Sequence, residues 1–301
     1  MAEARSQRVS IVAMAGRTIY AVLEETAKAQ SAVAALHQPV AGGYRTWNWI
    51  EYREAAREIA AGLRVLGVKK GEIVALYSET RAEFYLADLG VMAAGAVAAA
   101  LYTSYPLPDQ ARNLRAAEIR VLFVENPKAM EVLRAAAGEE AGGWCWILLT
   151  GEAEGALTLD TLREQGRQAM ASEPGLFERI QDSYTPDDYA ILYLTSGATG
   201  EPKMGLVTHR AIVANLDVGP TVLPIGPEDS TIVFLPSAHI AQRVVLELLP
   251  LRMGTPVWFS ESLSRLPNEM RSIRPTFLLA PPRVWERIYS SVCTEIRKRP
   301  A

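Results

Sequence analysis

The chain has 301 residues, 49% of them hydrophobic and 22% charged, which is enough apolar material for a large core in one large domain or two. Its formal net charge of −3 and its pI near 5.8 argue against a nucleic-acid-binding surface. The longest apolar run, residues 89–102, is shorter than the roughly 20 residues needed to span a bilayer.

From residue 18 onward, segments with helical spacing of apolar residues alternate with short runs that are apolar throughout. Helices are predicted over residues 18–29, 49–66, 83–94, 108–117, 128–137, 158–166, 208–218, 238–251, 263–273 and 284–297. Buried strands are predicted over residues 73–77, 96–101, 120–124, 144–149, 190–194, 231–235, 256–259 and 276–280. Residues 38–45 are expected to form a loop or hairpin, and residues 220–227 a linker. The alternation predicts an α/β fold with mostly parallel, layered sheets.

The most informative stretch is the polar loop that follows the predicted strand at 190–194. Its glycines let successive backbone N–H groups point at one anion. Thr195, Ser196 and Thr199 add hydroxyl donors, and Lys203 adds a positive charge. On composition alone, a simple polar turn between a strand and a helix is an equal alternative. A Walker A loop is a poor match, because no Gly-Lys-Ser/Thr sequence opens a helix here.

The order of the residues in this loop resembles the phosphate loop of the adenylate-forming (AMP-binding) superfamily. That signature is Thr-Ser-Gly-Thr-Thr-Gly-x-Pro-Lys-Gly, followed by Thr-His. The matching residues here are Thr195, Ser196, Gly197, Thr199, Gly200, Pro202, Lys203, Thr208 and His209. Two residues depart from the signature. Ala198 replaces a threonine, and Met204 stands where the family has glycine, which would strain Met204 if the family's glycine has a positive φ.

The resemblance implies which residues of this loop contact ATP. The residues expected to bind its phosphates are Thr195, Ser196, Gly197, Ala198, Thr199, Gly200 and Lys203. Lys203 is also expected to act in catalysis. No metal-binding residue is assigned.

Other segments are similar to the same superfamily, and several are closest to its long-chain fatty acyl-CoA synthetases. These segments are residues 44–47, 62–68, 70–75, 95–97, 101–106, 234–244 and 281–288. The resemblance therefore extends from about residue 17 to residue 297.

The three histidines lie in different contexts. On sequence alone His239, at the end of a predicted strand, is more often a structural residue. The resemblance instead implies that His239 lies at the acyl pocket, controls access to it and binds substrate. His209 suits packing and hydrogen bonding as well as ligand contact, and His37 is expected at the surface.

The resemblance implies a ligase that joins a fatty acid to coenzyme A, with ATP, Mg²⁺ and coenzyme A as cofactors or co-substrates. The fatty acid is first converted to an acyl-adenylate with release of pyrophosphate, and the thiol then displaces AMP. Two alternatives stay open. One is another carboxylate-activating enzyme, such as an aryl-CoA ligase or a peptide-synthetase adenylation domain. The other is a truncated, non-catalytic homologue that binds nucleotide.

The superfamily's members are about twice as long as this chain. Their Tyr-Gly-x-Thr-Glu motif is absent from the sequence. We therefore expect a leader helix and loop over residues 1–45 and the N-terminal part of the AMP-binding large domain over residues 46–301, without the rest of that domain or the C-terminal lid. The 301 residues alone are expected to be inactive, and they are expected either to be poorly soluble or to associate with one another.

The expected location is the cytoplasm. Glu3 interrupts the basic region that a signal peptide would need, and no cleavage site follows. Cys145 and Cys293 lie far apart without metal-ligand spacing, which favours free thiols in a reducing compartment. Peripheral contact with a membrane and the oligomeric state stay open.

Overall fold

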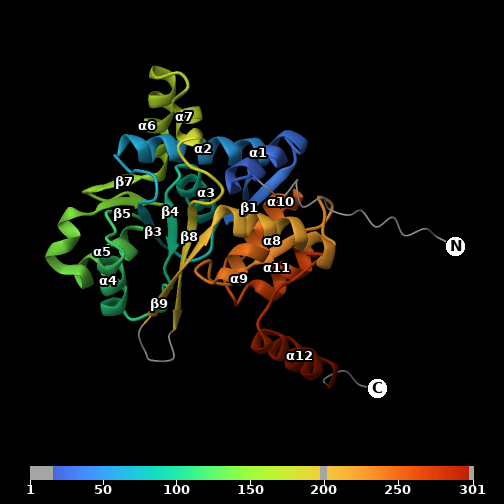
Figure 1. The fold of residues 1–301 in the computed structure, drawn as a ribbon. Coiled ribbons are helices and arrows are strands. Elements are labelled where there is room, and N and C mark those ends of the chain that lie inside the picture. Colours follow the sequence, from blue (N-terminus) through green and yellow to red (C-terminus); the bar gives the residue numbers. More distant parts are fainter. Residues whose placement is uncertain (1–15, 197–201, 298–301) are drawn as a thin grey trace.

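The computed structural model describes residues 16–196 and 202–297 (Figure 1). The strands are β1 (Ala34–Val40), β2 (Gly43–Asn48), β3 (Ile73–Tyr77), β4 (Val97–Ala100), β5 (Val121–Val124), β6 (Cys145–Leu148), β7 (Ala156–Thr158), β8 (Tyr189–Ser196), β9 (Pro202–Thr208), β10 (Thr231–Val233) and β11 (Val257–Phe259). They form two sheets, one of seven strands and one of four.

Helices surround both sheets. The α-helices are α1 (Ile19–Ala29), α2 (Trp49–Val65), α3 (Ala82–Ala93), α4 (Leu107–Ala116), α5 (Pro127–Ala137), α6 (Leu159–Ser172), α7 (Leu176–Asp182), α8 (His209–Val222), α9 (Ile240–Gln242), α10 (Leu249–Met253), α11 (Leu266–Ile273) and α12 (Pro282–Arg297). A 3₁₀-helix, η2 (Gly138–Gly143), follows α5, and a π-helical segment, η3 (Arg243–Leu248), joins α9 to α10.

The larger sheet has the strand order β7-β6-β5-β3-β4-β8-β9. Every neighbouring pair is parallel except β8 and β9, which are antiparallel. All residues of β4 and β5 are buried, as expected for apolar strands covered on both faces. The predicted α/β fold with mostly parallel sheets is therefore confirmed.

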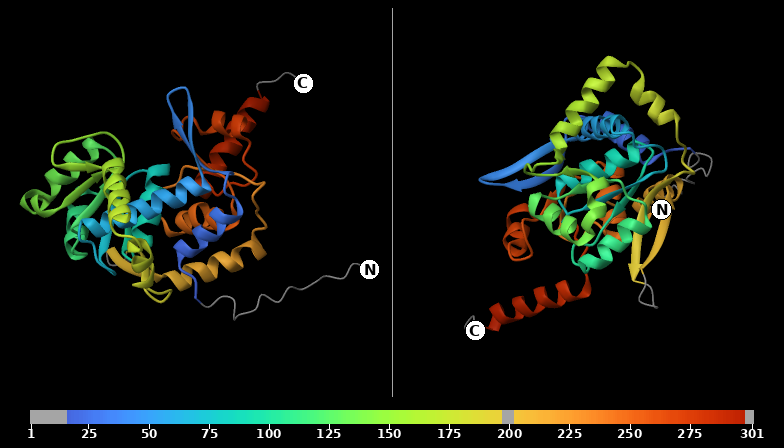
Figure 2. Two further views of the ribbon diagram at one scale, coloured as in Figure 1. Left: turned by 90° about the horizontal axis from the view of Figure 1, so that it is seen from above. Right: turned by 90° about the vertical axis from the view of Figure 1, so that its left-hand side faces the viewer.

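The smaller sheet joins distant parts of the sequence in the order β10-β11-β1-β2. The β1–β2 hairpin fulfils the expected loop or hairpin, and it projects from the body of the molecule (Figure 2). The position expected to end the leader segment, residue 45, lies within β2. His37 is half-buried rather than at the surface, because its ring stacks on Trp258 with 3.7 Å between ring centres. This burial lowers the pKa of His37 to about 4.

Several predicted elements differ from the structure. Residues 276–280 form no strand, and only Phe277 makes an isolated bridge, to Thr231. The predicted linker begins too early, because α8 continues through Pro220 to Val222. Pro220 removes one backbone donor and its ring crowds the carbonyl of Leu216, and the helix ends two residues later. Strand β7 and helix α7 were not predicted, because both are short and lie among polar residues.

Helices α2 and α6 touch through glycines. A Cβ atom on Gly166 would lie 1.9 Å from the backbone oxygen of Glu58, and one on Gly62 would lie 2.4 Å from the backbone oxygen of Leu162. Backbone atoms cannot move aside as a flexible side chain can. The two helices therefore require glycine at these crossing points.

Replacing Gly166 by alanine should destabilise the chain by about 2 kcal/mol or more, because the helices must separate to admit the methyl group. Gly142→Ala is the control, since a Cβ atom there meets nothing within 4 Å. Urea unfolding of both variants measures the difference. Equal unfolding midpoints would show that the α2–α6 contact is looser than described.

Helix α12 extends away from the rest of the molecule (Figures 1 and 2). Trp285, Tyr289, Val292 and Ile296 recur every three or four residues along it and are 46–72% exposed. Residues at this spacing share one side of a helix. Helix α12 thus presents an uncovered apolar face.

We expect this face to make the 301-residue chain associate with itself. Light scattering over a range of concentrations should show species larger than a monomer, and the double variant Tyr289→Ser with Val292→Ser should reduce them. Val222→Ser is the control, because Val222 is 74% exposed at the end of α8. A monodisperse monomer at every concentration would contradict the expectation.

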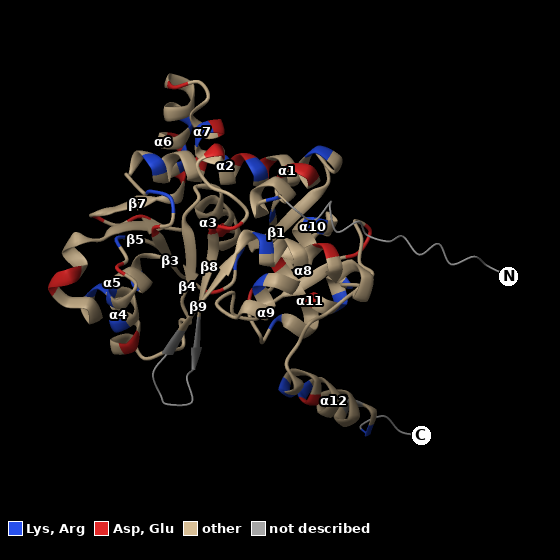
Figure 3. Ribbon diagram, in the orientation of Figure 1, with Lys and Arg blue, Asp and Glu red and all other residues tan. Residues whose placement is uncertain are grey.

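Acidic and basic residues are interspersed on the outer helices α1, α2 and α6 (Figure 3). Both cysteines are free and half-buried. Within the described ranges, no helix is long and apolar enough to cross a membrane.

Candidate active site

The described residues on either side of the phosphate-loop segment lie at the paired ends of β8 and β9. Thr195 pairs with Lys203, and Ser196 pairs with Pro202, so residues 197–201 join the two strand ends. Four of the predicted phosphate-binding residues, Gly197, Ala198, Thr199 and Gly200, lie outside the described residues. For Thr195, Ser196 and Lys203 the structure places the backbone at the two ends of the connection.

Residues 202–207 were expected to belong to a loop, but they lie in strand β9. Met204 lies opposite Leu194 in the extended ladder, which removes the predicted backbone strain at Met204. Gly205 faces the ring of Tyr193, and a Cβ atom on Gly205 would lie 2.4 Å from that ring. Gly205, which stands one position after the glycine of the family signature, therefore allows the Tyr193 ring to pack closely against β9.

Thr208 and His209 fix the end of the hairpin. The Thr208 hydroxyl accepts the backbone N–H of Ala211 at 3.2 Å and caps α8, as predicted. His209 is fully buried, and its Nδ1 accepts the backbone N–H of Ile19 at 3.3 Å. Burial lowers the pKa of His209 to about 4, so the ring is neutral at pH 7. In this structure His209 joins the start of α1 to the start of α8.

His239 lines a cavity of about 280 Å³. It caps α9, since its Nδ1 accepts the backbone N–H of Ala241 at 3.2 Å, and its side chain is exposed. The other lining residues are mostly apolar: Tyr102, Leu235, Pro236, Ala241, Gln242, Leu279, Ala280 and Pro281. An apolar cavity with few polar groups is typical of a small-molecule site.

The cavity and the phosphate-loop segment lie at the same edge of the larger sheet. Ala99 of β4 pairs with Leu192 of β8 in parallel register. Three residues further along each chain come Tyr102, at the cavity, and Thr195, at the start of the loop segment. Ligands of open α/β sheets bind outside the carboxyl ends of the strands, which is where both features lie.

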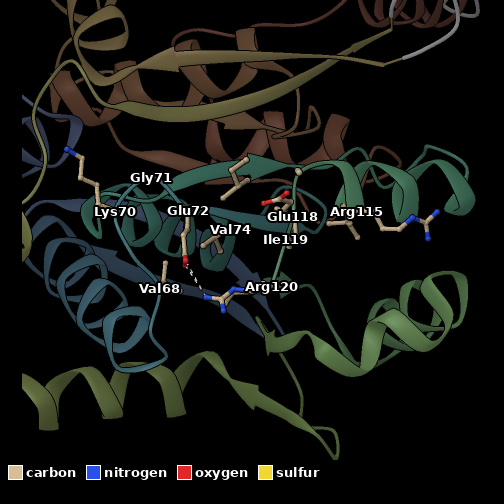
Figure 4. A pocket seen from close by; sticks show the side chains of 13 residues that line it. Val68, Lys70, Gly71, Glu72, Val74, Arg115, Glu118, Ile119 and Arg120 are labelled. Carbon is tan, nitrogen blue, oxygen red and sulfur yellow. Dashed lines mark hydrogen bonds and ion pairs between the residues drawn. The ribbon is translucent and has the colours of Figure 1, made fainter.

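A larger cavity of about 720 Å³ lies at the opposite, amino edge of β3 and β5 (Figure 4). Most of its charged lining residues are paired: an Arg120 guanidinium nitrogen donates to Glu72 at 3.3 Å, Lys70 Nζ lies 2.9 Å from an Asp188 carboxylate oxygen, and an Arg115 nitrogen lies 3.2 Å from a Glu140 oxygen. This position and pairing favour the smaller apolar cavity as the active site.

A buried charged cluster lies behind the apolar cavity, between α3 and η3. Arg243 and Asp88 form a two-pronged ion pair, and their side chains are 1% and 0% exposed. Glu247, one turn after Arg243, is also buried, and neither of its oxygens has a donor when it is ionised. No role was predicted for these residues from the sequence. The available signal was a charge inside two otherwise apolar helical stretches.

The pKa of the Glu247 carboxyl is raised well above its usual range, first by burial and then by the Asp88 carboxylate, with Arg243 opposing both. Burial also raises the pKa of Asp88, against the effect of Arg243. A protonated Glu247 can donate to Asp88, which leaves one negative charge to balance Arg243.

This proton makes stability depend on pH. Above about pH 5 the unfolded chain has lost the Glu247 proton, but the folded chain keeps it until the raised pKa is reached. Across that window this group lowers the free energy of unfolding by about 1.4 kcal/mol per pH unit. Glu247→Gln should remove the slope, so the difference in the free energy of unfolding between the variant and the wild type should grow as the pH rises above about 5 in urea unfolding. Parallel curves for the two proteins would contradict the shared proton.

The fold and these sites can be compared with known proteins. The sequence profile of the family described as "AMP-binding enzyme" matches residues 23–299. The chain belongs to this family. This assignment confirms the resemblance seen in the phosphate loop and in the flanking segments.

Relatives in the AMP-binding enzyme family include fatty acid ligases. The chain is 29% identical over 290 residues to "Fatty acyl-CoA synthetase A" of Dictyostelium discoideum, covering 91% of this chain and 42% of that protein. It is 27% identical over 266 residues to "Long-chain-fatty-acid--CoA ligase 6" of Mus musculus, covering 82% of this chain and 37% of that protein. The chain thus spans about two-fifths of the length of these relatives.

A solved structure gives the same fold. The inhibitor-bound N-terminal domain of FACL13 from Mycobacterium tuberculosis superposes with a TM-score of 0.74, at 21% identity, over 94% of this chain and 66% of that one. Within the part of the chain that the structure describes, no group of three or more His, Cys, Asp or Glu side chains could hold a metal ion.

Proposed function

We propose that this chain forms the ATP-phosphate-binding and acyl-binding part of a long-chain fatty acid–CoA ligase. The observation that carries the proposal is the shared sheet edge: the loop segment after β8 and the apolar cavity after β4 follow neighbouring parallel strands. The names of the relatives from Dictyostelium and mouse support a fatty acid as the substrate.

In the first half-reaction the fatty acid carboxylate attacks the α-phosphate of ATP, and pyrophosphate leaves. Negative charge grows on the departing pyrophosphate, so fixed donors and a cation aimed at it lower the barrier. Lys203 supplies the cation, and Thr195, Ser196 and the backbone of residues 197–200 supply donors. When Mg²⁺ is bound with ATP, it would neutralise further phosphate charge.

In the second half-reaction the thiol of coenzyme A attacks the acyl carbonyl, and AMP leaves. The apolar cavity holds the alkyl chain, and the exposed His239 contacts the substrate at the cavity's edge. Burial of the alkyl chain contributes about 0.8 kcal/mol per CH₂ group, which favours long acids over short ones as far as the cavity extends.

The acids accepted by the natural protein test this assignment. Incubation with ATP, Mg²⁺, coenzyme A and each of hexadecanoate, octanoate, benzoate and a set of amino acids should give a thioester chiefly with hexadecanoate. A thioester chiefly with benzoate would indicate an aryl-CoA ligase. An amino acid adenylate would indicate a peptide-synthetase domain.

A second candidate is nucleotide binding without turnover, favoured by the absence of a Tyr-Gly-x-Thr-Glu motif from these 301 residues. We infer that the 301 residues alone bind nucleotide without turnover. Calorimetric titration with ATP and Mg²⁺ should show binding, and hexadecanoate should give no adenylate. Turnover by the 301 residues would show that they are sufficient for catalysis.

A further inference from the structure

A chain of hydrogen bonds with fixed directions runs beside the apolar cavity. The Tyr85 hydroxyl lies 3.1 Å from the backbone oxygen of Leu246, and Nε2 of Gln242 lies 3.1 Å from the Tyr85 oxygen. A peptide oxygen only accepts, so Tyr85 donates to Leu246 and accepts from Gln242. This order fixes which end of the Gln242 amide faces Tyr85.

The same amide nitrogen also donates to Ser237 Oγ at 3.3 Å. Ser237 Oγ lies 2.9 Å from Thr80 Oγ1, and Thr80 donates to the backbone oxygen of Leu235. Since the Thr80 proton is used there, Ser237 donates to Thr80. Tyr85 and Ser237 each donate once and accept once through their hydroxyls, whereas the Thr80 hydroxyl also accepts the backbone N–H of Ser237 at 2.8 Å. Gln242 supplies the two amide donors.

The buried position of the Gln242 side chain leaves one of its polar atoms without a hydrogen-bond partner among the described residues. Gln242 is 1% exposed, and the atom concerned is Oε1. An unpaired buried acceptor destabilises a fold. The two donated hydrogen bonds are thus what the amide contributes at this position.

The hydrogen bonds connect residues that line the cavity to one helix. Gln242 and Leu235 line the cavity directly, and both are tied through the chain to Tyr85 of α3 or to Thr80 just before it. The next residue, Arg243, pairs with Asp88 of α3 and donates to the backbone oxygen of Ala98 at 3.2 Å. Ala98 belongs to β4, which leads to Tyr102, another residue that lines the cavity.

We propose that Gln242 is a positioning residue that sets the spacing between the walls of the acyl cavity, an inference that rests on the proposed fatty acid ligase function. Its two donors link the Ser237 side chain and the start of the α9–η3 helix to Tyr85 of α3, and they add to the direct hydrogen bonds between Thr80 and the Leu235–Ser237 loop. Without them, the loop and the helix start shift relative to Tyr102, and the acid binds less well. The ATP phosphates bind on the β8–β9 hairpin, which this chain of hydrogen bonds does not touch.

The test is a comparison of KM values in the natural protein, from exchange of labelled pyrophosphate into ATP. Gln242→Met keeps the length of the side chain but removes both donors. It should raise the KM for hexadecanoate about tenfold, while the KM for ATP stays within about twofold.

Gln181→Met is the matched control. Gln181 also donates to the backbone of α3, at 2.7 Å from the oxygen of Ala93, and accepts from a tyrosine, Tyr184, at 2.9 Å. It lies away from the cavity, so both KM values should stay near those of the wild type. If Gln242→Met does not fold, Ser237→Ala removes one acceptor of the chain and should raise the KM for hexadecanoate about threefold.

The outcomes separate this inference from the proposed function. An unchanged KM for hexadecanoate, or an equal rise in both KM values, would overturn the role of Gln242 and leave the ligase assignment standing. Exchange that does not depend on any fatty acid in the wild type would overturn both.

Discussion

Replacing Arg243 by leucine should destabilise the protein by about 3–5 kcal/mol, which is a large part of the stability of a typical domain. The substitution leaves the Asp88 carboxylate buried without its cation, and the hydrogen bond to Ala98 is lost as well. The Glu247 proton cannot compensate for both carboxyl groups. Urea unfolding at pH 7, followed by tryptophan fluorescence, measures the loss.

Arg210→Leu is the control for this experiment. Arg210 and Asp187 also form a two-pronged pair, with distances of 2.6 and 2.8 Å, but both residues are exposed. Water solvates each charge when its partner is removed, so the unfolding midpoint should change little. The double variant Arg243→Leu with Asp88→Leu should recover part of the lost stability, because it removes the Asp88 carboxylate that the single variant leaves buried without a cation. Equal effects of Arg243→Leu and Arg210→Leu would contradict the burial of the pair.

Replacing Lys203 by alanine should slow adenylate formation on the order of 10² to 10³-fold, the usual effect of removing one donor aimed at developing charge. The charge grows on pyrophosphate as it leaves, so kcat for pyrophosphate exchange should fall more than the affinity for ATP. The natural protein and its Lys203→Ala variant are compared with hexadecanoate as the acid.

Lys69→Ala is the control for the charge itself, since Lys69 lies in the turn before β3, at the opposite edge of the sheet. That variant should keep the exchange rate of the wild type. An exchange rate near the wild-type value in Lys203→Ala would refute the role of Lys203 and would leave the membership in the AMP-binding enzyme family untouched.

The buried parallel strands could be predicted from the sequence because short runs that are apolar throughout are typical of strands covered on both faces. Residues 73–77 are apolar throughout, and they form β3 with those bounds. Residues 190–194 likewise form the centre of β8. Strand β9 was not predicted because it is the outermost strand of the larger sheet, so its sequence lacks the pattern of a buried strand. It begins with Pro202, and Met204 and Leu206 are 40% and 46% exposed.

The polar network behind the cavity could not be predicted because its partners lie far apart in sequence. Arg243 and Asp88 are separated by 155 positions. Taken alone, the sequence around each residue predicts a charged side chain on the exposed face of a helix. Gln242 lies in residues 234–244, a segment that resembles the family, but the residues next to it in sequence do not indicate that it donates a hydrogen bond to Tyr85. Only the packing of α3 against η3 brings these side chains together.

The most direct test of the proposed function is detection of the acyl-adenylate itself. The natural protein is incubated with ATP, Mg²⁺ and hexadecanoate, without coenzyme A, and the quenched mixture is examined by mass spectrometry. We expect hexadecanoyl-AMP in an amount close to that of the protein, and its disappearance into a thioester when coenzyme A is added. A folded protein that binds ATP but forms no adenylate with any fatty acid would contradict the assignment of this site to fatty acid activation.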